Sequence, residues 1–211
     1  MQLDKDKSDK RSQLLAIAER LFATQGFDAV SIRDLAREAN MNIAMVSYYF
    51  GSKEKLFEEI IESKKPFMRE KLLQLKNNTN ITAWEKIAQT IDLYTDIVFK
   101  SRYFNQIIHR EITSQQRPAL ANLLLEYVQT NFGIIEDFIK EGQGKGVFRY
   151  IDVELTIMTI MSVINTTVNN SRLCGKLLHE EPEEIFSDRN KQRVNQHLKS
   201  LLQSHLFIRP V

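Results

Sequence analysis

The chain has 211 residues, of which 43% are hydrophobic and 27% charged, a composition typical of a globular protein with a buried core. Its 29 basic and 27 acidic residues leave a net charge of +2, so overall charge does not by itself indicate nucleic-acid binding. The sequence predicts no signal peptide, no membrane span and a cytoplasmic location, because the N-terminus is polar, no apolar run approaches the roughly 20 residues of a span, and Cys174 is the only cysteine.

The first predicted helix is marked by apolar residues that recur at every third or fourth position over 14–22. Gly26 is well placed to end this helix, and residues 1–9 ahead of it are expected to form a flexible arm. Ser31 begins a second helix, because its hydroxyl and the Asp34 carboxylate three residues later form an approximate capping box.

A third, short helix follows a tight turn. Asn40 tolerates the left-handed backbone that such a turn requires, and Asn42 can cap the helix after it. Nothing between Asn40 and Ser52 is charged, and Ser52 caps a fourth helix that Pro66 is expected to kink or end. The inward positions of the third helix would be Met41, Met45 or Val46, and Phe50.

Longer helices separated by short breaks are predicted from Thr82 onward, and no stretch alternates long enough to indicate a sheet. The glycine cluster 142–146 lacks the spacing of a phosphate-binding loop, and a helix end followed by a turn explains it. The fold class is therefore predicted as all-α. The expected helices cover roughly 82–100, 103–116, 118–141, 152–175 and 183–207.

Two short helices joined by a three- or four-residue turn, the second of them amphipathic, have the geometry of a helix-turn-helix motif. The second helix of such a motif can enter the major groove of DNA, which is about 12 Å wide. The helical turn carries Tyr48 and Tyr49 off the buried stripe, and Lys53 follows them at the next helix start. These three side chains are therefore predicted to donate hydrogen bonds to phosphates.

Residues 31–57 read SIRDLAREANMNIAMVSYYFGSKEKLF, and residues 18–31 ahead of them read AERLFATQGFDAVS. Over about residues 10–60 this pattern resembles the N-terminal signature of the TetR family of bacterial transcriptional repressors. The resemblance implies a helix-turn-helix DNA-binding domain over 1–60 and a helical ligand-binding and dimerisation domain over 61–211. It also implies a homodimer on a palindromic double-stranded DNA operator, from which a small-molecule effector releases it.

Carried over by position, the resemblance places base contacts at the start of the third helix and phosphate contacts around it. The chain departs from the usual pattern at Asn40, Met41 and Asn42, and Ser47 stands where most members have a phosphate-contacting tyrosine, a contact that Tyr48 could take over. The candidate DNA-binding residues are Ser31, Arg33, Asn42, Ile43, Ala44, Met45, Ser47, Tyr48, Tyr49 and Lys53. For Arg33, a surface ion pair with Asp34 or Glu38 is the alternative.

In the second domain, aromatic and methionine side chains could line a cavity for a small apolar effector, or could equally be core. The candidate ligand-binding residues are Trp84, Tyr94, Tyr103, Phe104, His109, Tyr127, Met158, Met161 and Asn165. The family plan implies a symmetric homodimer through about 152–175 and 183–207, and a closed monomeric bundle is the rival interpretation.

The leading hypothesis is therefore a ligand-responsive DNA-binding regulator. The alternative is a helical homodimeric interaction protein that does not read a specific DNA sequence. An all-α enzyme has no catalytic constellation behind it, and no cofactor is expected. No metal site is expected either, because the four histidines show no ligand spacing and have no cysteine partners.

Overall fold

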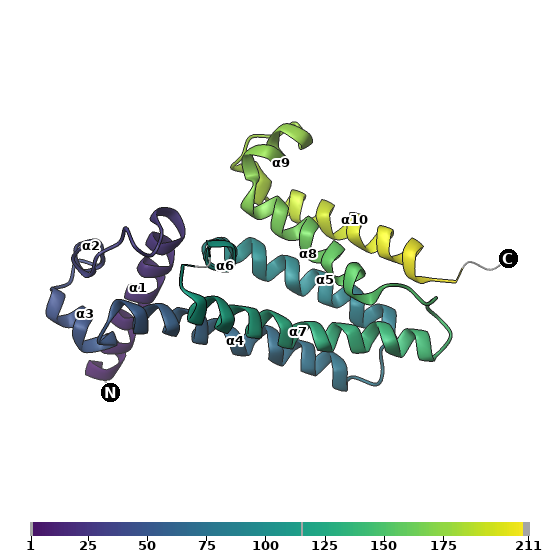
Figure 1. Cartoon of the computed structure of the whole chain (residues 1–211), viewed down its shortest axis with the longest axis horizontal. Helices are drawn as coiled ribbons and strands as arrows, with labels where there is room; N and C mark the ends of the chain where they lie inside the picture. The colour runs from purple at the N-terminus through teal and green to yellow at the C-terminus, as the bar shows by residue number, and fades with distance from the viewer. Residues whose placement is uncertain (1, 115, 209–211) are drawn as a thin grey trace. The chain divides into compact units, whose positions relative to one another are not determined.

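The computed structural model describes residues 2–114 and 116–208, with the side chains of all of these except residues 2–8 and 65. Within these ranges the regular structure is helical, apart from one isolated antiparallel bridge between Phe148 and Phe207 (Figure 1). The all-α prediction is confirmed.

Contacts divide the chain into two compact units. Unit 1 combines Met1–Pro66 with Tyr103–Leu125, and unit 2 combines Phe67–Arg102 with Glu126–Val211. The chain passes from one unit to the other within α4, near the boundary between α5 and α6, and within α7. A segment distant in sequence therefore belongs to the same compact unit as the predicted helix-turn-helix.

Unit 1 begins with α1, which spans Gln2–Gln25. Residues 2–9, expected to be a flexible arm, are the first turns of this helix, and neither glycine nor proline interrupts the stretch up to Gln25. Gly26 follows with a φ of 93°, as a helix-ending glycine requires. α2 (Ile32–Glu38) and α3 (Ile43–Phe50) come next.

The fourth helix, α4, runs from Lys53 to Asn77 and has Pro66 inside it. Of the two predicted alternatives at Pro66, a kink or an end of the helix, the end is wrong, because α4 continues past this residue. A proline removes one backbone hydrogen bond, and the helix continues because apolar residues such as Met68 and Leu72 beyond it are buried.

The core of unit 1 is built around three phenylalanines. The ring centroids of Phe22 and Phe27 are 5.2 Å apart, those of Phe22 and Phe57 5.5 Å, and those of Phe27 and Phe57 5.2 Å. This cluster joins the end of α1, the turn after it and α4. α6 (Arg102–Ser114) and the first turns of α7 (Pro118–Gly144) complete the unit.

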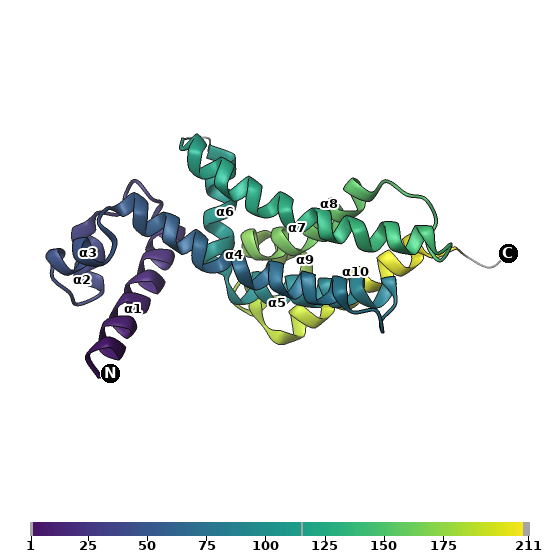
Figure 2. The same ribbon diagram turned by 90° about the horizontal axis from the view of Figure 1, so that it is seen from below.

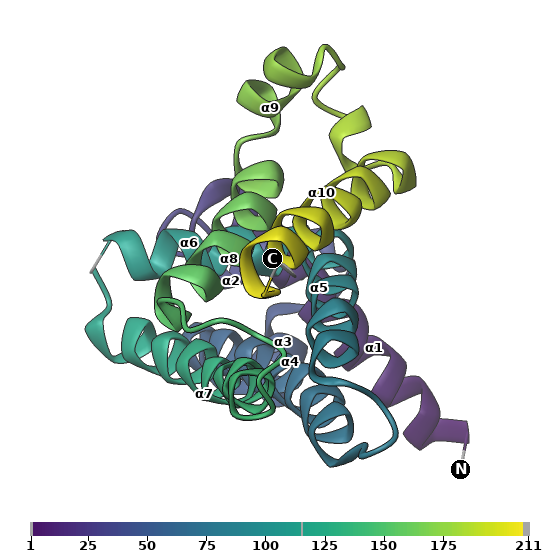
Figure 3. The same ribbon diagram turned by 90° about the vertical axis from the view of Figure 1, so that its right-hand side faces the viewer.

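Unit 2 is a helical bundle in which α5 (Ala83–Lys100), α8 (Val153–Asn169) and α10 (Asp188–Leu206) pack side by side (Figures 2 and 3). Two predicted helices are each divided. The segment 152–175 is broken at Asn170 into α8 and α9 (Ser171–Leu178), and 183–207 is broken at Ser187 into the short η1 (Glu184–Phe186) and α10. Asn170 has a non-helical backbone, and the Ser187 hydroxyl accepts from the amide of Asn190 to cap α10.

The glycine cluster lies at a helix end followed by a turn, as predicted, but the helix ends three residues beyond the expected 141. α7 continues to Gly144, and the chain turns at Gly146, whose φ is 67°. Gly142 is helical and lies under the Phe148 ring, since a Cβ at this position would fall 2.0 Å from Phe148 Cδ2. This glycine is a packing site, at which any larger residue would collide with the returning chain.

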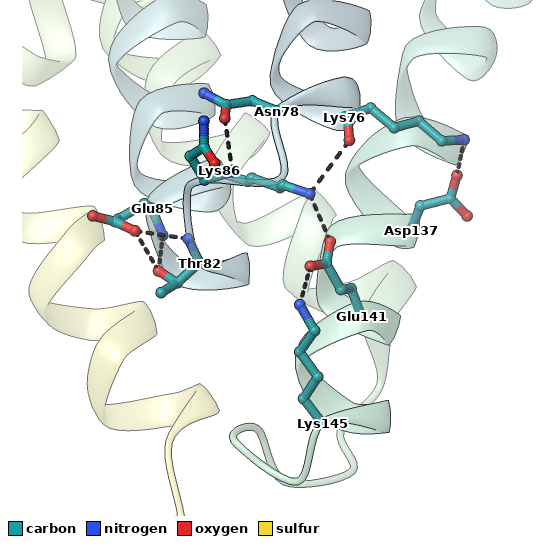
Figure 4. A network of polar contacts seen from close by, with 9 residues as sticks. Lys76, Asn78, Thr82, Glu85, Lys86, Asp137, Glu141 and Lys145 are labelled. Carbon is teal, nitrogen blue, oxygen red and sulfur yellow. Dashed lines mark hydrogen bonds and ion pairs between the residues drawn. The ribbon is translucent and has the colours of Figure 1, made fainter.

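A polar network ties three helices together at one end of unit 2 (Figure 4). The buried Lys86 Nζ on α5 donates to Glu141 Oε2 on α7 at 2.8 Å and to the Lys76 carbonyl on α4 at 3.4 Å. Lys145 binds the other Glu141 oxygen at 2.6 Å, and Lys76 binds Asp137 at 2.7 Å. These paired charges fix the end of α4 against α5 and α7.

Candidate nucleic-acid interface

α2 and α3 each begin at a side chain that caps the helix. At the start of α2, the Asp34 amide donates to Ser31 Oγ at 3.1 Å and the Ser31 amide donates to Asp34 Oδ2 at 3.0 Å, which is the predicted capping box. These hydrogen bonds hold the pKa of the Asp34 carboxyl below its usual value. α2 ends before Asn40, whose φ of 52° is the predicted left-handed conformation.

Asn42 is the N-cap of α3, and its Oδ1 accepts from the Met45 amide at 2.7 Å. The first four amides of a helix have no partner within the helix. In the eight-residue α3 this hydrogen bond supplies a partner for one of them. The start of α3 is therefore held in a defined orientation by a residue that is itself exposed.

The two faces of α3 differ sharply in exposure. Val46 and Phe50 are buried and anchor the helix, as predicted, whereas Met41 and Met45 are only half-buried. The outward face carries Ile43, which is 46% exposed, and Tyr48, which is 74% exposed. Among the candidate DNA-binding residues, the exposed ones are Ser31, Arg33, Asn42, Ile43, Ala44, Ser47 and Tyr48, and the half-buried ones are Met45, Tyr49 and Lys53.

The aromatic residues at the end of α3 are packed against one another. The rings of Tyr48 and Tyr49 meet edge to face with centroids 5.6 Å apart, and the Tyr49 and Phe50 centroids are 6.3 Å apart. The Arg11 guanidinium lies over the Phe50 ring at 5.1 Å and pairs with Glu59. These contacts join the three rings at the end of α3 into one cluster.

Lys53 is engaged within the fold. Its Nζ donates to the carbonyls of Phe27 at 2.9 Å and Val30 at 3.0 Å, and lies 4.2 Å from the centroid of the Phe27 ring. An ammonium group has three donors, and two of them are used here. Lys53 therefore anchors the turn between α1 and α2, a role that the sequence analysis did not anticipate.

Arg33 is exposed on α2, and both carboxylates considered as its alternative partners are bound elsewhere. Arg37 Nη2 lies 2.6 Å from Asp34 Oδ1, and Arg20 pairs with Glu38. The surface-pair interpretation of Arg33 is thus not supported by the positions of these two carboxylates.

The candidate ligand-binding residues are divided between the two units. Tyr103, Phe104 and His109 lie on α6 in unit 1. Phe104 is buried there, with Lys64 Nζ 5.9 Å from its ring centroid, and His109 is exposed.

In unit 2 the structure brings Tyr94, Tyr127 and Asn165 into one neighbourhood. The Tyr94 hydroxyl donates to Asn165 Oδ1 at 3.2 Å. Burial raises the pKa of Tyr94 to about 12, with the Asn165 hydrogen bond acting against this and Tyr127 adding to it. Burial also raises the pKa of Tyr127. Met161 packs against the core of the unit.

Two further candidates of unit 2 lie apart from these. Trp84 packs edge to face on Phe207, with centroids 5.6 Å apart. Met158 is 56% exposed on α8, beside Leu155, which is 58% exposed. Large apolar side chains are also exposed on α9, at Leu173 and Leu177, and on α10, at Leu201.

Residues 14–60 match the model of the bacterial regulatory proteins of the tetR family. The match runs from within α1 to within α4 and includes α2, α3 and the turn between them. The chain belongs to the TetR family. It is a DNA-binding transcriptional regulator and not an enzyme.

Similarity to individual TetR-family proteins extends over most of the chain. It is 22% identical to the probable HTH-type transcriptional regulator YttP of Bacillus subtilis over 183 residues, covering 85% of this chain and 87% of that protein. It is 28% identical to the HTH-type transcriptional repressor NicS of Pseudomonas putida over 143 residues, covering 66% of each. The solved structure of the ketosteroid transcriptional regulator KstR2 of Mycobacterium tuberculosis shares the fold, with a TM-score of 0.76, 17% identity, and coverage of 94% of this chain and 95% of that one.

Two negative findings concern the described residues of this TetR-family chain. None of their helices is long and apolar enough to cross a membrane. No group of three or more histidine, cysteine or acidic side chains among them is placed to hold a metal ion.

Proposed function

We propose that this protein is a sequence-specific repressor that binds a palindromic DNA operator as a homodimer and is released by a small apolar effector. One observation carries the proposal. α3 presents an exposed face without charged residues, and both α2 and α3 begin at a side-chain N-cap, so a short helix of fixed orientation is available to enter the major groove and read base edges.

The start of α3 is proposed to read bases. Asn42 Oδ1 caps the helix, so its Nδ2 remains able to donate to an acceptor on a base edge. Ile43 and Ala44 are exposed next to it and offer apolar contact to thymine methyl groups. Half-buried Met45 would contribute at the edge of this surface, and Arg33 on α2 would reach a base or a phosphate.

The flanks of α3 are proposed to bind phosphates. Tyr48 and Tyr49 would donate through their hydroxyl groups, and the exposed Ser31 and Ser47 would add theirs. Lys53 would use its third hydrogen for a phosphate while its first two hold the turn. We propose that the main role of Lys53 is to hold the turn between α1 and α2, and that phosphate binding is secondary.

We propose that dimerisation uses α8 and α10 with their flanking segments, 152–175 and 183–207. Leu155 and Met158 are exposed one turn apart on α8, and burial of such side chains is the main driving force for association. Leu155→Glu is expected to give a monomer by sedimentation velocity at micromolar concentration. Lys71→Glu, on the exposed surface of α4, is the matched control and should leave the dimer intact.

The effector is proposed to bind in unit 2 near Tyr94, Tyr127 and Asn165. These side chains supply neutral hydrogen-bonding groups close to a largely apolar core. A mostly apolar molecule that carries a hydroxyl or carbonyl group fits such surroundings better than a sugar or an ion does. Release of DNA requires the effector to bind the DNA-free form more tightly than the DNA-bound form.

The test is a fluorescence-anisotropy titration of the protein against the DNA upstream of its own gene, or against duplexes that it selects from a random pool. A scrambled duplex of equal length is titrated beside it at near-physiological salt. Preference for the selected duplex by about a thousandfold or more supports specific reading. Equal, salt-sensitive binding to both duplexes refutes it and favours the interaction-protein alternative.

A further inference from the structure

The turn between α1 and α2 is held by side chains from a distant part of the chain, which we call the α6–α7 corner (residues 103–125). Arg117, the residue before α7, donates from Nη1 to both carboxylate oxygens of Asp28 at 2.7 and 2.7 Å. The other edge of the same guanidinium donates to Glu111, from Nε at 2.9 Å and from Nη2 at 2.8 Å. One arginine therefore joins a carboxylate of the turn to a carboxylate of α6.

The two carboxylates differ in their surroundings. Glu111 is only 2% exposed, so its charge depends on Arg117 for compensation, whereas the side chain of Asp28 is 69% exposed. The Arg117 hydrogen bond holds the pKa of the Asp28 carboxyl below its ordinary value. The buried pair thus fixes the arginine, and the fixed arginine holds the exposed aspartate of the turn.

Two further contacts hold the same turn. The guanidinium of Arg117 lies 4.7 Å from the Phe27 ring centroid, and Lys53 Nζ lies 4.2 Å from it, so two cations contact one ring. Arg110 of α6 donates from Nη1 to the Phe22 carbonyl at 3.0 Å, at the end of α1. The carbonyls of this segment therefore bind α4 through Lys53 and α6 through Arg110.

The turn between α1 and α2 leads directly into α2 and, through α2, to α3. α2 begins immediately after this turn, with Ser31 as its N-cap. The turn at Asn40 and the N-cap Asn42 then set the position of α3 relative to α2. The division into compact units agrees with these contacts, because it places Tyr103–Leu125 with Met1–Pro66. The α6–α7 corner therefore belongs to unit 1, which also contains α3.

We propose that Arg117 is a positioning residue for DNA reading: its bond to Asp28 keeps the turn between α1 and α2 in the place from which α3 can bind DNA. The inference rests on the proposed function and adds to it a control point away from α3. If the turn leaves this position, α3 can bind DNA only during the fraction of time in which the turn occupies it. The apparent dissociation constant for DNA then rises by the inverse of that fraction.

The first variant is Asp28→Asn, because the substitution keeps the shape of an exposed residue and removes the charge that Arg117 binds. If the turn is in place about one tenth of the time, DNA binding weakens about tenfold per head. The matched control is Asp137→Asn, which removes an exposed aspartate paired with Lys76 in unit 2 and should leave DNA affinity unchanged.

The second variant is Arg117→Gln, and the double variant Asp28→Asn with Arg117→Gln completes a cycle. If the two side chains act through one bond, adding Asp28→Asn to Arg117→Gln costs little further affinity. Preference for the selected duplex over the scrambled one and the dependence of affinity on salt should stay unchanged, because Arg117 is not proposed to touch DNA. Circular dichroism of each variant checks that it is folded.

Amide hydrogen exchange gives a readout that a merely stabilising ion pair would not move. In the wild-type chain, binding of the selected duplex is expected to slow exchange in α6, since coupling between two sites is reciprocal. In Asp28→Asn this slowing should be lost, while α10 should exchange alike in both proteins. Wild-type affinity in Asp28→Asn and Arg117→Gln would overturn the positioning role alone. Failure of the wild-type chain to prefer any duplex would overturn the proposed function itself, and the positioning role with it.

Discussion

The side chain of Asn42 has two separable roles, which three substitutions can distinguish. Its Oδ1 accepts from the Met45 amide at 2.7 Å and caps α3, and its Nδ2 is proposed to donate to a base. Asn42→Ala removes both groups. Asn42→Ser keeps a capping oxygen and loses the amide, and Asn42→Asp keeps the cap and replaces the amide with a negative charge facing DNA.

The expected magnitudes follow from these contacts. Loss of the N-cap costs about 1 kcal/mol of unfolding free energy, which for a chain of this size lowers Tm by about 2–4 °C. Asn42→Ser and Asn42→Asp should therefore stay within a few tenths of a kcal/mol of the wild type. Loss of one good base contact costs about 1–3 kcal/mol of discrimination against the wrong base, in Asn42→Ala and Asn42→Ser alike.

Thermal unfolding at one fixed protein concentration measures the first effect, because the stability of a dimer depends on concentration. Anisotropy titrations against the selected duplex and its single-base variants measure the second. An Asn42→Ala protein as stable as the wild type would refute the capping role. Equal discrimination by wild type and Asn42→Ser at every base pair would refute the base contact, whatever the stability data show.

Three other predictions concern stability and ionisation. Gly142→Ala should destabilise the chain by about 1–3 kcal/mol in urea unfolding, because the new methyl group would meet the Phe148 ring. Gly133→Ala is the control: nothing lies within 4 Å of the added Cβ, so this change should stabilise the chain by about 0.5–1 kcal/mol. A spectrophotometric titration should find one tyrosine that ionises near pH 12, and Tyr94→Phe should remove that step. Asp28 has a folded pKa below its ordinary 3.8, so its contribution to stability is present above that pH and is lost as pH falls through the folded pKa. The free energies of unfolding of wild type and Asp28→Asn should therefore differ near neutral pH and converge in strong acid. A difference that stays the same at every pH would contradict the assignment.

The helix-turn-helix could be predicted closely because its signals are local. Ser31 with Asp34, the left-handed Asn40 and the capping Asn42 each act within three or four residues, and all three were found as expected. Burial of Phe50 and exposure of Tyr48 followed from helical periodicity alone.

Features that depend on tertiary packing were harder to predict. The continuation of α4 through Pro66 and of α7 through Gly142 reflects packing that outweighs local preference. The bond between Arg117 and Asp28 joins residues 89 positions apart, and no spacing rule links them. Lys53 gave a signal at a helix start, but its sequence position could not distinguish a phosphate contact from a bond to nearby carbonyls.

The make-up of unit 1 bears on how proteins of this kind can be recombined. The segment that matches the family model, 14–60, is continuous, but the compact unit that contains it also includes Tyr103–Leu125. A chimaera that takes only the first 66 residues would combine them with the α6–α7 corner of another protein. Asp28 would then lose its partner Arg117. New sensor specificities should therefore be grafted in place of Phe67–Arg102 and Glu126–Val211, so that Tyr103–Leu125 stays with the first 66 residues.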